Sequence, residues 1–471
     1  MDRLREPVRL ATGLDAEGNL SAQAQERGLE CLGRFGQRLR DLRPANVRAV
    51  GTNALRRARN GRAFLRAAQR ALGHRIEVVS GAEEARLIYL GVAHSSSAAG
   101  PRLVVDIGGG STELILGQGF DPMRLESLFM GCVSMSERHF PDGLIDKGAL
   151  QRAELAARLE VEPVRWEFAP SDWNVATGAS GTIKAIQDTV KRKGWSAQGI
   201  TRESLKRLRV ALLEAGRVEA LPARLGVSED RAPVFPGGLA VLLGVFKSLG
   251  IHTMDVSDGA LREGLLLDLM GRVRQEDVRA RTVRTIEQRY AIDAAHAHRV
   301  ASTARRLLRD VREGWLLRDE EYESFLTWAA QLHELGLLIA HTQYHKHGGY
   351  ILENADLPGF SRGDQSLLAA LVRGHRRKFS AGAFADLPKE LRWPAERLCV
   401  LLRIAVTLQR DRGSTPPPEI RARAVDRSLE LEFPGGWLEH HPLTRADLEQ
   451  EARYLQAAGF QLSWEPLSVT A

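Results

Sequence analysis

Residues 104–117, with the sequence VVDIGGGSTELILG, constrain the possible fold more than any other segment. Two apolar runs of strand-forming residues flank three consecutive glycines. A dinucleotide-binding fingerprint needs a further glycine at position 113, which is Glu113, and a helix after the loop. A Walker loop needs a lysine before Ser or Thr, and the segment has no lysine. The pattern therefore predicts a β-hairpin whose glycine turn points backbone N–H groups outward, where an anion can bind.

Two acids flank the mouth of this predicted hairpin. Asp106 ends the first strand, and Glu113 lies one residue into the second strand. Two carboxylates beside a bound phosphate repel it, and a divalent cation, normally Mg²⁺, resolves the conflict. For the isolated motif, a plain hairpin whose acids cap backbone amides remains the alternative.

Residues 80–86, SGAEEAR, begin a predicted helix that follows a predicted strand at residues 75–80. Ser80 and Glu83 match a capping box, which leaves Glu84 in the first turn without a structural explanation. Near a strand end of an α/β sheet, such a carboxylate can act as a general base on water. An exposed acid that only interacts with the helix dipole is the alternative.

Several further turns offer groups that bind phosphate. The segment GTNALRRA, residues 51–58, places Arg56 near the start of a helix, where it can clamp a phosphate or simply lie on the surface. The segments TGASGT, residues 177–182, and SDGALREG, residues 257–264, present amide donors at helix N-termini. One such turn is weak evidence, whereas several in one α/β unit favour a cleft that handles phosphoryl groups.

The order of the predicted elements divides the chain into four parts. Strand-like and helix-like segments alternate up to about residue 270, which indicates α/β architecture, and helical periodicity dominates after that point. Residues 412–420, RGSTPPPEI, predict a proline-stiffened linker before a final strand, helix and strand. The expected domains comprise residues 1–87, 88–270, 271–412 and 413–471.

Net charge, sequence signatures and cysteine positions indicate the class of partner and the compartment. The formal net charge of +7 is a mild indication of polyanionic partners, although a solvated arginine-rich surface is the more frequent explanation. The sequence has no nucleic-acid-binding signature, no apolar run long enough to span a bilayer and no secretory signal at its start. Cys31, Cys132 and Cys399 are far apart, which favours a reducing compartment and argues against a zinc site.

Five segments resemble, in the same order, those of the exopolyphosphatase / guanosine pentaphosphate phosphohydrolase (Ppx/GppA) family. They are VVSGAEEARLIYLGV, LVVDIGGGSTELILG, MGCVSMSERHFPDG, ATGASGTIKAI and VSDGALREGLL. A later segment, WAAQLHELGLLIAHTQYHKHGGYIL, is similar to the helical domain of the long bacterial exopolyphosphatases. The resemblance implies an α/β actin-like (ribonuclease H-like) ATPase-superfamily fold with two lobes. An all-α HD-like domain and a small α/β C-terminal domain are expected to follow.

The resemblance also implies roles for individual residues. Glu84 corresponds to the catalytic base, Arg56 to a phosphate-contacting arginine, and Asp106 and Glu113 to the residues that bind Mg²⁺ and orient the attacking water. Residues expected to contact phosphate are Gly108, Gly109, Gly110, Ser111, Gly178, Ser180, Gly181, Arg231 and His341. Basic candidates to line a channel for a long polyanion are Arg231, Lys184, Lys191, Arg192 and Lys193.

The activity expected first is Mg²⁺-dependent exopolyphosphatase, which releases orthophosphate from the end of inorganic polyphosphate. Guanosine pentaphosphate phosphohydrolase is the alternative on the same scaffold, and a non-catalytic polyphosphate-binding regulator is a third. The family normally opens with a strand and an Asp-x-Gly-Ser-Asn-Ser loop, and no such motif occurs in this sequence. We therefore expect an N-terminally shortened form that lacks the first phosphate loop and has weak or no activity. The resemblance further implies a cytoplasmic homodimer, and it leaves contact with the inner face of the membrane open.

The helical part resembles the HD phosphohydrolase fold, whose metal site needs His, His-Asp and a later Asp. His296 and His333 fit the first two positions, but Glu334 replaces the first Asp and Val406 the second. Valine cannot bind a metal ion, so the sequence predicts no metal and no catalysis in this domain. The remaining basic side chains of this region, expected to be structural or to touch phosphate, are His341, His345, Lys346 and His347.

Overall fold

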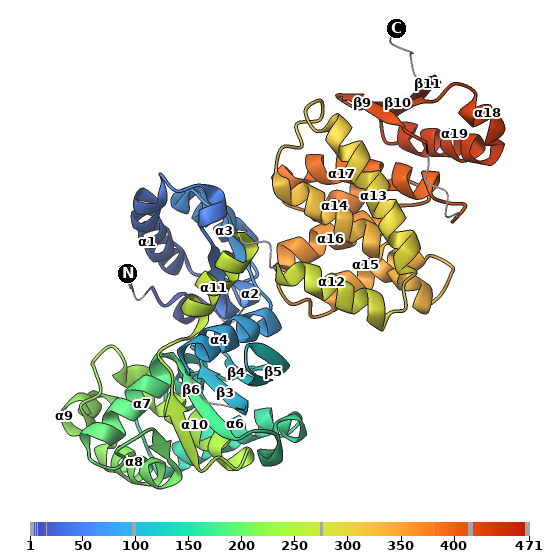
Figure 1. Ribbon diagram of the computed structural model, residues 1–471. Helices are drawn as coiled ribbons and strands as arrows, with labels where there is room; N and C mark the ends of the chain where they lie inside the picture. Colours follow the sequence, from blue (N-terminus) through green and yellow to red (C-terminus); the bar gives the residue numbers. More distant parts are fainter. Residues whose placement is uncertain are drawn as a thin grey trace. The chain divides into compact units, whose positions relative to one another are not determined.

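The computed structural model describes residues 4, 6, 8–15, 17–96, 100–273, 277–379, 381–412 and 418–466 (Figure 1). It contains two compact units, Met1–Asp277 and Val278–Ala471. The predicted boundaries after residues 87 and 270 fall inside continuous helices of the first unit. Most of the predicted linker, residues 413–417, lies outside the described residues.

A six-stranded sheet organises most of the first unit, in the order β5-β4-β3-β6-β8-β7. Strands β3, β4 and β5 form an antiparallel meander, β6 and β8 continue the sheet parallel to β3, and β7 pairs antiparallel with β8. The bounds are β3 Pro101–Ile107, β4 Thr112–Gln118, β5 Asp121–Leu128, β6 Val175–Ala179, β7 Ile200–Thr201 and β8 Thr253–Val256. The predicted hairpin around the three glycines is therefore confirmed as β3–β4.

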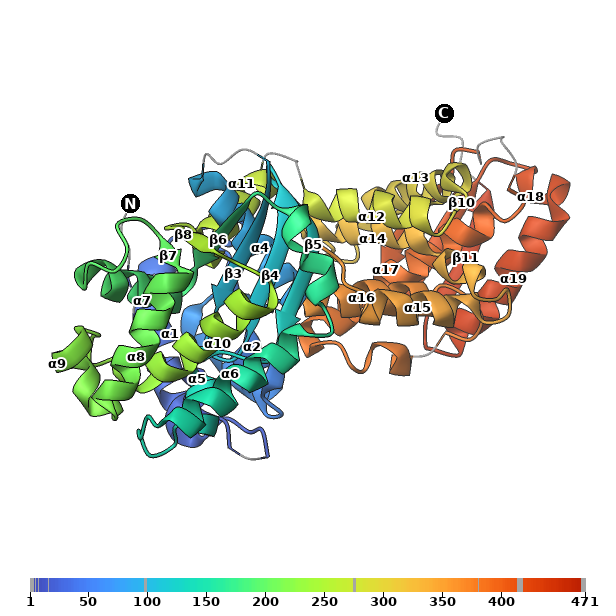
Figure 2. The same cartoon turned by 90° about the horizontal axis from the view of Figure 1, so that it is seen from below.

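Helices cover both faces of this sheet because its central strands are apolar on both sides. One face packs against four helices, α5 Cys132–His139, α6 Lys147–Val161, α7 Ser180–Arg192 and α10 Phe235–Ser248, and α8 Arg202–Ala215 and α9 Leu221–Leu225 extend the same core (Figure 2). The other face packs against α4 Gly81–Ser95 and α11 Leu261–Val273. A Cβ on Gly264 would collide with the carbonyl oxygen of Leu87, so glycine is needed where α4 and α11 cross.

A smaller α/β part precedes α4. Strands β1 Ala49–Gly51 and β2 Ile76–Val78 are parallel. Helices α1 Ala22–Leu39, α2 Asn53–Arg57 and α3 Gly61–Leu72 surround them. Their core is separate from that of the large sheet and centres on Phe64, Ala68 and Leu72. The first unit thus consists of two α/β parts, and α4 leads from one to the other.

In the described part of the second unit, six α-helices precede a small α/β segment. The helices are α12 Val278–Arg289, α13 Ala294–Val311, α14 Glu320–Leu332, α15 Tyr344–Asn354, α16 Arg362–Gly374 and α17 Lys389–Leu408. The segment contains β9 Arg421–Val425, β10 Ser428–Phe433, α18 Trp437–His440, α19 Pro442–Gln456 and β11 Gln461–Pro466, with the sheet order β11-β10-β9. One hydrophobic core runs through both, so the predicted C-terminal domain packs as part of this unit.

None of the described helices combines the length and the apolar character that a membrane span needs.

Candidate active site

Glu84 lies in the first turn of α4, where the sequence places it. Ser80 caps the helix, and its Oγ accepts a 3.1 Å hydrogen bond from the Glu83 N–H. The side chain of Glu84 is buried rather than exposed, and its Oε2 accepts a 2.7 Å hydrogen bond from Nη1 of Arg56. The same Nη1 donates to the carbonyl oxygen of Val79 at 3.1 Å. Arg56 therefore ties the candidate base to the segment that leads into α4.

The neighbouring Glu83 forms ion pairs with arginines instead. Its carboxylate accepts hydrogen bonds of 2.8 and 2.9 Å from Nε and Nη2 of Arg86, and it lies 3.7 Å from Nη2 of Arg48. Both arginines also pair with Asp268 of α11. Glu77 and Arg272 extend this buried network. It joins the residue before β1 to α4 and α11 and holds the first turn of α4, with Glu84 in it, in place.

Asp106 and Glu113 are directly opposite each other in the β3–β4 register. Their neighbours Val105 and Leu114 point into the core of the opposite face, so the two acids lie on the face that α4 covers. Asp106 is 7% exposed and Glu113 is 1% exposed. The hydroxyl of Ser127, the β5 residue paired with Glu113, donates a 2.9 Å hydrogen bond to Glu113 Oε1. The structure therefore adds Ser127 to the site.

Burial perturbs all three acids, and repulsion adds to it for Asp106 and Glu113. Burial, with a smaller contribution from Glu84, raises the pKa of Asp106 to about 7. Burial together with Glu84 and Asp106 raises the pKa of Glu113 to about 8, although hydrogen bonds from Ser111 and Ser127 oppose this rise. Burial also raises the pKa of Glu84 against the opposing effect of Arg56. Carboxylate oxygens are the ligands that a hard divalent cation such as Mg²⁺ prefers, so these acids are candidates to hold one.

The glycine loop approaches its neighbours too closely for side chains. The N–H of Gly108 donates to Ser111 O at 2.9 Å, and Gly109 O accepts from the N–H groups of Val133 and Ser134 at 2.9 and 3.1 Å. A Cβ on Gly110 would lie 2.6 Å from Asn53 Oδ1. None of the three glycines has a left-handed φ, so close approach explains Gly108 and Gly110, whereas a Cβ on Gly109 would only make an ordinary contact with Val133 at 3.5 Å.

The N–H groups of this loop provide donors for an anion. Within the described part of the chain, those of Gly109 and Gly110 have no hydrogen-bond acceptor. Because the loop joins the two strands that carry Asp106 and Glu113, these donors lie beside the acid pair. The arrangement suits a phosphoryl group whose oxygens accept from the loop while a cation neutralises the acids.

The junction of β6 and α7 contains three of the predicted phosphate contacts, Gly178 in β6 and Ser180 and Gly181 at the start of α7. Ser180 has a φ of 86°, which is unusual for a residue other than glycine. Its buried Oγ has no hydrogen-bond partner among the described residues. A Cβ on Gly181 would collide with the guanidinium of Arg231, so Arg231 lies against this junction. The carbonyl of Gly178 accepts from Ser257 N at 2.8 Å.

The third predicted turn, residues 257–264, uses its amides internally. Ser257 Oγ accepts a 3.1 Å hydrogen bond from Gly259 N, and Glu263 Oε2 accepts one of 3.0 Å from Ala260 N. Lys184 Nζ lies 3.0 Å from a carboxylate oxygen of Asp258. This turn therefore offers fewer donors to a ligand than its glycine pattern indicates.

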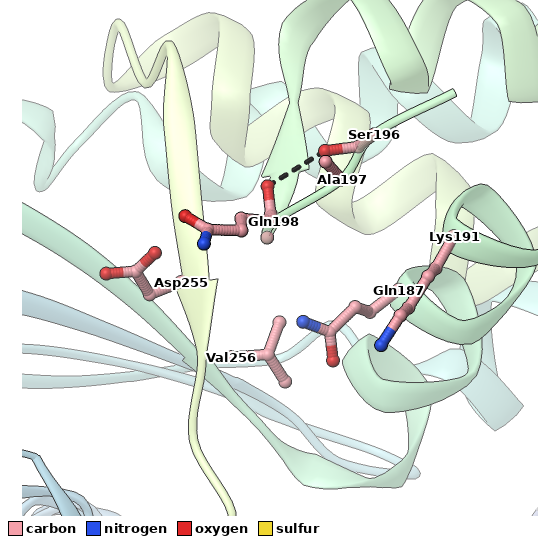
Figure 3. A pocket seen from close by; sticks show the side chains of 8 residues that line it. Gln187, Lys191, Ser196, Ala197, Gln198, Asp255 and Val256 are labelled. Carbon is pink, nitrogen blue, oxygen red and sulfur yellow. Dashed lines mark hydrogen bonds between the residues drawn. The ribbon is translucent and has the colours of Figure 1, made fainter. Parts of the chain in front are cut away.

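Two of the predicted channel residues lie away from the acids. Arg192 donates to the carbonyl oxygen of Gly226, which is a structural role. Lys191 lines a pocket of about 340 Å³ with Gln187 of the same helix and Asp255 of β8 (Figure 3). The pocket residues do not include any of the three clustered acids. His341 belongs to the second unit, on the exposed segment before α15.

Family models and curated relatives match nearly the whole chain. The model of the Ppx/GppA phosphatase family matches residues 1–273, and that of Ppx/GppA phosphatase domain III matches residues 278–452. The guanosine-5'-triphosphate,3'-diphosphate pyrophosphatase of Vibrio cholerae is 41% identical over 469 residues, which cover 99% of this chain and 93% of that protein. The protein of the same name from Pseudoalteromonas translucida is 40% identical over 460 residues, or 98% and 92% of the two chains.

Two solved structures share the fold. An exopolyphosphatase-like protein superimposes with a TM-score of 0.52 at 24% identity, over 58% of this chain and 92% of that chain. An exopolyphosphatase from Cytophaga hutchinsonii gives a TM-score of 0.50 at 24% identity, over 56% and 88%. These likenesses agree with the two-lobed, actin-like arrangement expected for the first unit. With both family models matched along the sequence, the chain belongs to the Ppx/GppA phosphatase family.

Proposed function

We propose that this protein is a Mg²⁺-dependent phosphohydrolase that removes the terminal 5'-phosphate of guanosine pentaphosphate. The observation that carries the proposal is the cluster of Glu84, Asp106 and Glu113 beside a glycine loop with free N–H donors. Support for the substrate comes from the two relatives at 40–41% identity, whose names specify guanosine 5'-triphosphate 3'-diphosphate. This substrate replaces polyphosphate, the one the sequence favoured.

Each residue of the site has its own proposed role in hydrolysis. Asp106 and Glu113 would hold Mg²⁺, which neutralises charge on the phosphoryl oxygens. Glu84 accepts a proton from water, whose oxygen bonds to the terminal phosphorus as the bridging P–O bond breaks; the bridging oxygen departs with guanosine tetraphosphate, and orthophosphate is released. Arg56 orients Glu84 through their 2.7 Å hydrogen bond, and a second guanidinium N–H can reach the phosphoryl group. The N–H groups of Gly109 and Gly110 stabilise charge that develops on that group.

Burial of Glu84 serves its role as a base. A carboxylate is a weak base at its ordinary pKa, and burial raises the pKa of Glu84 toward the working pH. Arg56 opposes this rise in the pKa of Glu84.

The experiment compares kcat/KM for orthophosphate release from guanosine pentaphosphate and from long-chain polyphosphate, with Mg²⁺ present. The ratio of the two values is independent of the absolute rate. We expect the ratio to favour guanosine pentaphosphate. An equal or reversed ratio would overturn the proposed substrate and restore polyphosphate. No release from either substrate would overturn the enzyme assignment and favour a binding regulator.

A further inference from the structure

The side chain of Asn53, the first residue of α2, has no part in the chemistry proposed above. Asn53 is 8% exposed, and its Oδ1 is buried without a hydrogen-bond partner among the described residues. The side chain does not cap α2, because Thr52 occupies the N-cap position. A buried amide oxygen without a partner is costly, so the stability of the fold does not explain an asparagine at this position.

Asn60, in the same smaller α/β part, shows how an asparagine with a structural role is bonded. Its Oδ1 accepts a 2.9 Å hydrogen bond from the N–H of Leu20, and its Nδ2 donates a 2.9 Å hydrogen bond to the carbonyl oxygen of Leu20. Both ends of that amide therefore fix the segment before α1. The Asn53 amide makes no such pair of bonds within the described ranges, which favours a role toward a ligand.

The Asn53 side chain faces the glycine loop of the candidate active site. A Cβ placed on Gly110 would lie 2.6 Å from Oδ1 of Asn53, 3.2 Å from its Cγ and 3.8 Å from its Nδ2. The N–H groups of Gly109 and Gly110 have no acceptor in the part of the chain that the structure describes. The unpartnered end of the amide is therefore next to the two donors that are available to an anion.

Helix α2 aligns Asn53 with the arginine that holds the candidate base. Residues 53, 56 and 57 are separated by three and four positions, so they lie on one face of the helix. Arg56 donates to Glu84 Oε2 at 2.7 Å. Burial raises the pKa of Glu137 in α5, and the nearby guanidinium of Arg57 opposes this rise. One face of α2 thus meets the glycine loop, the candidate base and α5.

We propose that Asn53 is a substrate-binding residue whose side-chain amide donates a hydrogen bond to an oxygen of the terminal phosphoryl group. The inference rests on the function proposed above and adds a third donor to the two N–H groups of the loop. A half-turn about the Cβ–Cγ bond exchanges Oδ1 with Nδ2, and this terminal torsion is soft in asparagine. With Nδ2 toward the loop, the amide offers N–H donors to a phosphate that also accepts from Gly109 and Gly110.

The position of Asn53 gives it a role that the loop alone cannot perform. Asn53 belongs to the smaller α/β part, whose core is separate from that of the large sheet, whereas Gly109 and Gly110 belong to the large sheet. A phosphate bound by both joins the two parts at the site. Since a ligand stabilises the arrangement that binds it best, the substrate also holds α2, and Arg56 with it, beside Glu84.

Calorimetric titration of the full chain with inorganic phosphate, in the presence of Mg²⁺, tests the inference without turnover. It is combined with kcat and KM for guanosine pentaphosphate. Asn53→Ala should weaken phosphate binding and lower kcat/KM roughly tenfold, because it removes a hydrogen bond to a charged group. Asn53→Asp keeps the shape and the acceptor but repels phosphate, so it should weaken both more than Asn53→Ala. Asn60→Ala, the matched control, should leave phosphate binding and KM unchanged.

The aspartate variant separates this role from a structural one. If Asn53 only accepted a hydrogen bond from the loop, Asn53→Asp would bind phosphate as the wild type does. That result would overturn the inference, as would unchanged binding in a folded Asn53→Ala variant, checked by circular dichroism, or no phosphate binding by the wild type. A wild type that binds phosphate but releases none from guanosine pentaphosphate would overturn the proposed function alone, and the ratio of dissociation constants would still decide the role of Asn53.

Discussion

Replacing Asp106 with Asn should make the metal-free protein more stable while abolishing its activity. The asparagine keeps the shape of the side chain but never ionises. In the wild type, the buried carboxylate loses its proton at high pH beside Glu84 and Glu113, and burial raises its pKa from 3.8 to about 7. The folded protein thus contains a buried carboxylate whose ionisation lowers the stability of the fold, and such destabilising groups are frequent at functional sites.

The magnitude follows from the two pKa values of Asp106. Since the folded state binds the proton more tightly than the unfolded chain, stability falls as pH rises between the two values and levels off above the higher one. The cost is up to about 4 kcal/mol at about pH 8 and about 1 kcal/mol at about pH 4.5. Asp106→Asn removes this cost, so its advantage over the wild type should shrink as the pH is lowered.

Urea unfolding of the full chain measures the difference, in a chelator and at both pH values. Saturating Mg²⁺ should stabilise the wild type more than Asp106→Asn, because the cation compensates the ionised carboxylates. Asp142→Asn, which replaces an exposed acid of the same unit, is the matched control and should change little. An Asp106→Asn protein that is no more stable than the wild type at about pH 8, or whose advantage does not depend on pH, would refute the reasoning.

Three further substitutions probe the supports of the site. Ser127→Ala removes the hydroxyl that lowers the pKa of Glu113, so the Glu113-dependent limb of the pH–rate profile should move to higher pH; an unmoved limb contradicts this. Gly131→Ala places a Cβ against the backbone of Gly109, so kcat should fall at least about tenfold, and wild-type kcat would count against the loop assignment. Arg86→Met removes the guanidinium that hydrogen-bonds buried Glu83, while Asp268 keeps Arg48 and Arg272; it should cost about 3 kcal/mol in urea unfolding, whereas a loss below about 1 kcal/mol would show the network to be dispensable.

The sequence predicted the parts of the site that depend on local pattern. Spacing around the glycines placed Asp106 and Glu113 on opposite strands of one hairpin, and the structure has them in register. The start of α4 followed from Ser80, and with it the position of Glu84. Local signals suffice here because a hairpin and a helix N-terminus are set by neighbouring residues.

Other parts depend on contacts between distant segments. Ser127 lies on β5, an edge strand whose alternating charged residues give a weak strand signal, and only its register places the hydroxyl at Glu113. The pairing of Arg48 with Asp268 joins residues that are 220 positions apart. The closeness of His296, His333 and Glu334 follows from how α13 packs against α14, and the absence of a metal in this domain, expected because of Val406, stays a prediction.

The most direct test of the proposed hydrolysis follows orthophosphate release from guanosine pentaphosphate in ¹⁸O-labelled water with Mg²⁺, for the wild type and Glu84→Gln. Attack of water on the terminal phosphorus predicts that one label enters the released orthophosphate and none enters the nucleotide. Loss of the base predicts a fall in rate of about 100-fold or more for Glu84→Gln, with substrate binding retained. Label in the nucleotide product, or full activity in Glu84→Gln, would contradict the proposed chemistry.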